Sequence, residues 1–168
     1  MDFFEGNKKH SNETFIRNSA PIMAWEFRYE FMNELKAAQE DLKRLKVFSS
    51  KFKWNSEELN IKDRIGEETV VITDLEQKIV FASSGILSMT GYSENEILGK
   101  TPKMFQGPST SEIALKEIRE AIKSRVPFDK TVLNYKKNGR TYKCKIEGYP
   151  VFNVKGKITH YIAFEKAA

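Results

Sequence analysis

The sequence is poor in the residues that build covalent or metal-centred sites. Its 168 residues include one cysteine, Cys144, and two histidines, His10 and His160. A single thiol excludes an internal disulfide and is typical of a reducing compartment. The three side chains are far apart in the chain and show no metal-ligand spacing, so the sequence predicts no metal site.

Signatures of membrane insertion and of catalysis are also missing. No apolar run approaches the roughly 18 residues that a membrane-spanning helix requires. Charges at Asp2, Glu5, Lys8 and Lys9 interrupt the apolar centre that a signal peptide needs. The sequence contains no phosphate-binding loop, glycine-rich dinucleotide fingerprint or nucleophile elbow. We therefore expect a cytoplasmic protein that is not an enzyme; a piece excised from a membrane-bound parent also fits.

Basic residues do not gather into a nucleic-acid-binding face. The formal net charge is +5, but lysines alternate with glutamates in most segments, and no block of five or six basic residues occurs. Phosphate contacts from such a block supply most of the affinity for nucleic acid. Nucleic acid is therefore not an expected partner.

The chain is long enough for one buried core and an appended element. It has 40% hydrophobic and 30% charged residues, the balance of an ordinary folded protein. We expect two parts: an N-terminal segment over residues 1–66 and a domain over residues 67–168. The stretch from Lys53 to Glu68 is expected to link them, with at most a turn of helix.

A long helix is predicted in the N-terminal segment. No glycine or proline occurs between Met23 and Gly66, and residues with high helix propensity dominate. Apolar residues recur at alternating spacings of four and three, the pattern of a seam shared by two helices. The seam consists of Phe31, Leu35, Ala38, Leu42 and Leu45. It predicts a homodimer joined by a coiled coil. The alternative is an amphipathic helix packed on its own domain, which the aromatic residues outside the seam favour.

Turn and capping signals divide the rest of the chain into short elements. Two β-branched runs, at 69–73 and 79–81, predict an opening hairpin. Ser93 with Glu96 forms a capping-box pattern that starts a short helix. A longer helix is predicted to start among Ser109, Thr110 and Ser111, with Ile113, Leu115, Ile118 and Ile122 as its buried stripe.

Three further strands are predicted after that helix. Asn138-Gly139 between two alternating runs predicts a hairpin in which both turn positions have positive φ. A last strand is expected at 158–164. The order of two strands, three helices and three strands predicts an α+β fold: a five-stranded antiparallel sheet with helices on one face, plus the N-terminal helical extension.

Several motifs make the region from about Thr69 to Lys166 resemble the PAS/PAC family of sensor domains, and within it the light-oxygen-voltage (LOV) branch, which binds flavin. The motifs are Gly91-Tyr92-Ser93, Gly99, Phe105-Gln106-Gly107-Pro108 and Asn134-Tyr135. The resemblance implies the PAS fold and a role in signal transduction, as in bacterial two-component sensors. It also implies a separate output domain or a protein partner.

The resemblance also implies a LOV-like domain without the photoactive cysteine. In the LOV branch, a cysteine thiol after the short helix adds to the flavin ring in light. Here Pro102 stands at that position, and no proline atom can make such a bond. Any flavin mononucleotide (FMN) bound by this chain must then signal without that adduct.

The same resemblance assigns a candidate ligand pocket. Gln106, Arg119 and Asn134 match the LOV glutamine, the phosphate-directed arginine and the first ring-binding asparagine. Thr101 and Cys144 stand where the family has asparagines. The candidate residues are Thr101, Met104, Gln106, Arg119, Asn134, Cys144 and Glu165.

Glu165 is the most consequential departure from the LOV pattern. It replaces a glutamine of the last strand, which can donate a hydrogen bond, whereas an ionised carboxylate only accepts one. A buried Glu165 therefore requires protonation, a nearby cation or a different ligand.

Three functions remain open from the sequence. The first is a sensory and dimerisation module that responds to an unknown ligand or partner. The second is a flavin-binding photosensor that forms no cysteinyl adduct. The third is a ligand-free interaction scaffold, favoured if Met104, Phe105 and Phe81 point inward and fill the interior.

Overall fold

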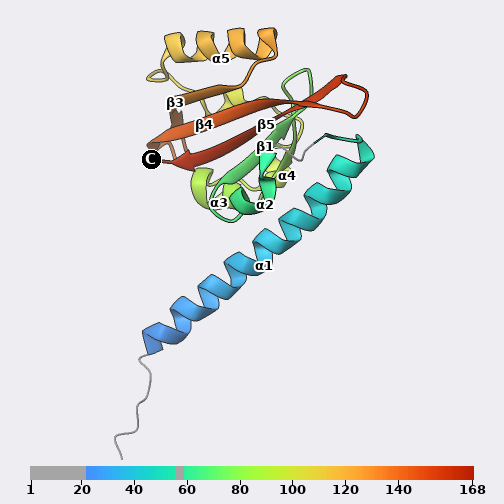
Figure 1. The fold of residues 1–168 in the computed structure, drawn as a ribbon. Coiled ribbons are helices and arrows are strands. Elements are labelled where there is room, and N and C mark those ends of the chain that lie inside the picture. The colour runs from blue at the N-terminus through green and yellow to red at the C-terminus, as the bar shows by residue number, and fades with distance from the viewer. Residues whose placement is uncertain (1–21, 56–58) are drawn as a thin grey trace, which may run out of the picture.

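The computed structural model describes residues 22–55 and 59–168, in which a long helix leads into a five-stranded sheet (Figure 1). Residues 1–21, the first part of the expected N-terminal segment, lie outside the described residues. The helices are α1 (Ile22–Lys51), α2 (Ile61–Arg64), α3 (Gly85–Thr90), α4 (Glu94–Ile97), the 3-10 helix η2 (Pro102–Phe105) and α5 (Glu112–Ser124). The strands are β1 (Thr69–Thr73), β2 (Ile79–Ala82), β3 (Phe128–Tyr135), β4 (Thr141–Phe152) and β5 (Ile158–Ala167).

The strands form one antiparallel sheet in the order β2-β1-β5-β4-β3. This confirms the predicted α+β fold with its five-stranded antiparallel sheet. β5 lies at the centre, where Ala163 pairs with Val71 of β1 and Glu165 pairs with Ile146 of β4. Because side chains alternate along a strand, Ala163 and Glu165 face one side of the sheet and Phe164 faces the other.

The predicted helix starts are present. Ser93 and Glu96 form the capping box of α4, and the Ser111 side chain accepts a hydrogen bond from the Ala114 N–H at the start of α5. One residue of the predicted α5 stripe is wrong, since Ile113 is exposed whereas Leu115 is buried. Residues two positions apart in an α-helix are separated by about 200° around its axis, so the side chains of Ile113 and Leu115 point to opposite sides.

The β3–β4 hairpin has a longer loop than predicted. Gly139 has a φ of 81°, but Asn138 is not among the described residues with positive φ. The Lys136 N–H donates to the Arg140 carbonyl, and the Asn138 side chain accepts from the Arg140 N–H. The turn is therefore a three-residue loop with one left-handed glycine, and the expectation of two positive-φ positions was wrong.

Both faces of the sheet carry a hydrophobic layer. The inner face packs against α3, α4, η2 and α5 through the cluster Val71, Ile79, Ala82, Ile86, Met89, Ile97, Phe105, Val132 and Cys144. The outer face packs against the C-terminal part of α1 and against α2, with Leu45, Trp54 and Ile65 in its core. The stretch expected to be a linker therefore contributes Trp54 and Ile65 to the packing of the sheet.

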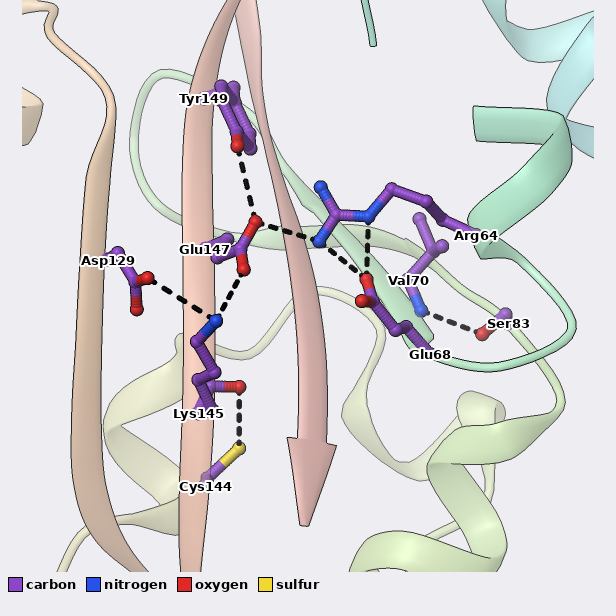
Figure 2. Close-up of polar contacts among 9 residues, drawn as sticks. All are labelled: Arg64, Glu68, Val70, Ser83, Asp129, Cys144, Lys145, Glu147 and Tyr149. Carbon is purple, nitrogen blue, oxygen red and sulfur yellow. Dashed lines mark hydrogen bonds and ion pairs between the residues drawn. The ribbon is translucent and has the colours of Figure 1, made fainter. Parts of the chain in front are cut away.

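An ion-pair network holds α2 on the outer face (Figure 2). Arg64 pairs with Glu68 at 2.6 Å and with Glu147 of β4 at 2.9 Å, and its guanidinium carbon lies 3.8 Å from the centre of the Phe164 ring. Lys145 also donates to Glu147, at 2.7 Å. This bond, with the Arg64 contact, lowers the pKa of Glu147. Part-buried, multiply paired charges of this kind fix one docking geometry.

A second polar cluster ties α1 to the loop before α3. The buried carboxylate of Asp41 accepts a hydrogen bond from the Ser84 N–H at 2.6 Å and pairs with Arg44 at 3.1 Å. Arg44 also pairs with Glu94 at 2.6 Å, and its guanidinium carbon lies 4.8 Å from the centre of the Phe81 ring. Asp41 thus accepts from a backbone N–H at the start of α3, whose own N-cap side chain makes no capping bond.

The predicted seam of α1 divides into two parts. Phe31 and Leu35 are 52% and 43% exposed, in the half of α1 that extends away from the sheet (Figure 1). Ala38 and Leu42 are half-buried, and Leu45 is 3% exposed in the outer-face core. Leu42 and Leu45 therefore pack on their own domain because the sheet meets the C-terminal half of the helix. Among the predicted seam residues, Phe31 and Leu35 remain the most accessible for contact with a second copy.

Candidate ligand-binding site

A cavity of about 520 Å³ lies between the inner face of the sheet and the segment formed by η2 and α5. Its apolar walls include Val71 and Ala163 from the sheet and Leu115 and Ile118 from α5. The Tyr161 hydroxyl, on β5, donates a hydrogen bond to the Ile122 carbonyl of α5 at 2.7 Å. This bond joins the two walls of the cavity, so the space is part of the folded domain. The expectation of an interior filled by its own side chains does not describe this structure.

Local backbone contacts place η2 at the cavity. The Ile79 N–H donates to the Lys100 carbonyl, and the Gly99 N–H donates back to the Ile79 carbonyl, each at 2.8 Å. Gly99 has a φ of 76°, a conformation that glycine adopts readily. Pro102 then opens η2, where its missing N–H costs nothing. The chain from α4 to η2 is therefore fixed to β2 before it lines the cavity.

Five of the seven predicted pocket residues line this cavity: Thr101, Gln106, Arg119, Asn134 and Glu165. Met104 and Cys144 are not among the lining residues. Met104 packs against the inner-face core, and Cys144 is buried within that core. The Cys144 thiol nevertheless contacts a lining residue, because its sulfur lies 3.7 Å from Glu165 Oε2.

The sheet wall of the cavity contains a buried acid, Glu165. Glu165 is 6% exposed, and burial raises the pKa of its carboxyl to about 7, since only a weak hydrogen bond from Cys144 opposes this effect. Burial and the neighbouring Glu165 together raise the pKa of the Cys144 thiol as well. No ion pair to Glu165 occurs in the described part of the chain. The Glu165 carboxyl is therefore mostly protonated and neutral at pH values below its pKa.

Two other lining residues were not predicted from the sequence: the cation Lys103 and the amide of Gln77. Lys103 lines the cavity with Arg119, and Arg119 lies 3.7 Å from Glu112 in an exposed ion pair. Gln77 also lines the cavity; its Nε2 is buried without a hydrogen-bond partner in the described part of the chain, and its backbone φ is 63°. Lys103 could have been identified by its place beside the motif residues. No sequence pattern distinguishes Gln77 from an ordinary turn residue.

Two other kinds of site find no support in the described residues. They contain no group of three or more histidine, cysteine, aspartate or glutamate side chains arranged to bind a metal ion. Within the same ranges, no helix is both long enough and apolar enough to cross a membrane.

In this chain an antiparallel sheet encloses a ligand-sized cavity against a helix, and a long N-terminal helix packs on the opposite face of the sheet. The chain belongs to the PAS domain family, whose model matches residues 67–166. This confirms the resemblance drawn from the sequence motifs and identifies the chain as a sensory signal-transduction module.

Two curated relatives place the chain near the LOV branch. Protein TWIN LOV 1 of Arabidopsis thaliana is 43% identical over 88 residues, which cover 52% of this chain and 22% of that protein. A blue-light-activated histidine kinase of Rhizobium johnstonii is 40% identical over 83 residues, which cover 49% of this chain and 24% of that protein. The chain therefore spans about a quarter or less of the length of these relatives, and the matched part is their sensor domain.

Solved structures agree with this placement. The light-state structure of the blue-light photoreceptor Aureochrome1 LOV has a TM-score of 0.59 at 33% identity and covers 66% of this chain and 88% of its own. A light-oxygen-voltage domain studied with a flavin analogue has a TM-score of 0.58 at 28% identity and covers 61% of this chain and 78% of its own. The PAS fold expected from the sequence is thus confirmed.

Proposed function

We propose that this PAS domain is a non-catalytic sensor that binds a small ligand in the cavity and transmits its state to α1. The observation that carries the proposal is the 520 Å³ cavity, in which buried Asn134 and Glu165 line apolar walls together with the cations Lys103 and Arg119. Apolar walls with a few polar groups are typical of small-molecule sites. A planar ring with an acidic substituent satisfies both kinds of lining group. The catalytic output belongs to another domain or to a protein partner, as the histidine kinase relatives suggest.

FMN is the ligand that we propose for this cavity. Gln106 and Asn134 offer amide hydrogen bonds, and Lys103 and Arg119 suit a phosphate group. The unpaired Nε2 of Gln77 supports an acceptor-bearing ligand, because a buried donor without a partner is costly. A bound flavin supplies absorption of blue light. Pro102 offers no thiol, so the change must reach the protein through hydrogen bonds and packing.

Fluorescence quenching of FMN tests this assignment. We expect the purified chain to bind FMN and Asn134→Leu to bind it about tenfold more weakly, since the similarly sized leucine removes one buried amide. Asn95→Leu, at an exposed position of α4, is the control and should bind like the wild type. Absence of FMN binding by the wild type, or equal affinities of the two variants, would contradict the assignment.

We further propose that the exposed half of α1 joins two copies of the chain. Its large exposed apolar side chains are Trp25, Phe27, Tyr29, Phe31, Met32 and Leu35. Exposed apolar surface of this extent on one helix is typical of an interaction site. A second copy buries the same surface on both partners, centred on the seam residues Phe31 and Leu35, as two-fold symmetry requires.

A further inference from the structure

Glu165 is a buried acid without a cationic partner in the described part of the chain, and the proposed function does not explain how its charge is accommodated. It lies near the end of central strand β5, opposite Thr69 of β1 and Ile146 of β4, with its side chain toward the cavity. Its carboxyl is buried at the inner face. A carboxylate in such surroundings loses its hydration, and the ionised form is then stable only beside a cation.

The charged and titratable groups around Glu165 do not supply that cation. On β4, the neighbours are the Cys144 thiol and the Tyr142 hydroxyl, and burial raises the pKa of both, so they stay neutral. Arg119, Lys103 and Glu112 line the same cavity but form no ion pair with Glu165. On the other side, a surface hollow next to Glu165 is lined by Lys136, Lys166, Glu34, Glu67 and Glu68, which likewise form no ion pair with it in the described part of the chain. The geometry therefore favours a neutral acid.

We propose that Glu165 selects the ligand as a neutral carboxylic acid that donates a hydrogen bond to an acceptor on the ligand ring. The Cys144 sulfur lies 3.7 Å from Glu165 Oε2 and 3.8 Å from the Lys145 carbonyl oxygen, and its one hydrogen can serve only one of them at a time. When the thiol donates to Oε2, the other oxygen of Glu165 is left to carry the proton. A neutral carboxyl has one donor and one acceptor, so it can make the two kinds of hydrogen bond that an amide makes. This inference rests on the proposed function, since it names the chemistry of the ligand edge in the same cavity: a ring carbonyl or an unprotonated ring nitrogen.

Binding of such a ligand must depend on pH. Only the protonated fraction of Glu165 is competent to donate, and the apparent affinity scales with the competent fraction. The carboxyl pKa of about 7 means that this fraction falls about tenfold from pH 6 to pH 8. A ligand that presents N–H donors at this end would show the opposite dependence, because an ionised Glu165 would accept from it.

Riboflavin is the suitable probe because it lacks the phosphate group that titrates near pH 6. Its affinity for the wild type and for Glu165→Gln is measured at pH 6, 7 and 8. We expect the wild type to lose about tenfold in affinity over this range and the glutamine variant to lose almost none. Parallel pH profiles in the two proteins, or tighter binding of riboflavin by the wild type at pH 8 than at pH 6, would overturn the inference.

A measurement on ligand-free protein separates this inference from the flavin assignment. Infrared spectroscopy should show the carbonyl stretch of one protonated carboxyl group in the wild type at pH 6, its loss by pH 8, and its absence from Glu165→Gln. If riboflavin and FMN both fail to bind, the flavin assignment fails, and the infrared signal alone still decides the state of Glu165. Absence of the protonated signal at pH 6 overturns the inference, whatever the flavin result.

Discussion

The sheet wall of the cavity presents an acid and an amide, and a buried thiol lies next to the acid. Glu165, Cys144 and Asn134 come from three adjacent strands, β5, β4 and β3, and all three are buried. Their place on the inner face could be predicted from the sequence, because side chains alternate between the two faces along each strand. That Cys144 lies behind Glu165 could not be predicted, since it depends on side-chain packing across two strands. The unpaired amide of Gln77 likewise depends on a turn conformation that the sequence does not specify.

The buried acid should make folding stability depend on pH. Burial raises the Glu165 pKa from its ordinary value of 4.5 to about 7, so the folded chain binds more protons than the unfolded chain between these values. Stability contributed by this group therefore falls as pH rises through that window. Glu165→Gln lacks the effect. We expect its stability relative to the wild type to increase by about 2 to 3 kcal/mol from pH 5 to pH 8, measured by urea unfolding. A pH-independent difference between the two proteins would contradict this account.

At the scale of elements, the docking of α1 distinguishes this chain from a bare sheet with an appended coiled coil. The capping signals at Ser93 and Ser111 predicted α4 and α5 because capping is local in sequence. The course of α1 depends on contacts across the fold, such as that between Asp41 and the Ser84 N–H, which are 43 residues apart. A heptad pattern alone does not reveal whether its apolar residues meet a second helix or their own sheet, and α1 divides them between exposed and buried surfaces.

Loss of the Asp41 carboxylate should weaken α1 docking. Asp41→Ala leaves the Ser84 N–H without its acceptor in a part-buried site and removes one of the two carboxylate partners of Arg44, which keeps Glu94. We therefore expect a loss of about 1 to 3 kcal/mol in the free energy of unfolding by urea. Glu40→Ala is the matched control, since Glu40 forms only an exposed ion pair with Lys43 and its loss should cost less than about 0.5 kcal/mol. Equal effects of the two substitutions would show that the cluster does not hold α1.

At the scale of the whole molecule, one sheet carries the cavity on one face and α1 with α2 on the other. Adjacent residues of β5 serve the two sides: Ala163 lines the cavity, whereas Phe164 is part of the outer-face core. A ligand that shifts β5 therefore changes the surface on which α1 packs. Such coupling requires two arrangements of the helix whose populations the ligand biases.

The exposed part of α1 is the predicted dimer contact. Phe31→Glu combined with Leu35→Glu places like charges on both partners at the symmetric contact, so we expect a monomer by light scattering. Val47→Glu is the control: Val47 is an exposed apolar residue near the other end of α1, and this change should leave the mass unchanged. A dimer that survives the double substitution would exclude this interface.

In the proposed sensor, the cavity holds a small ligand and two copies of the chain pair through α1. Native mass spectrometry of the purified wild-type chain tests both parts together, because it reports subunit number and bound mass in one measurement. The account predicts two chains that each retain one molecule with the mass of a flavin nucleotide. A single chain that binds nothing, even after addition of FMN, would contradict it.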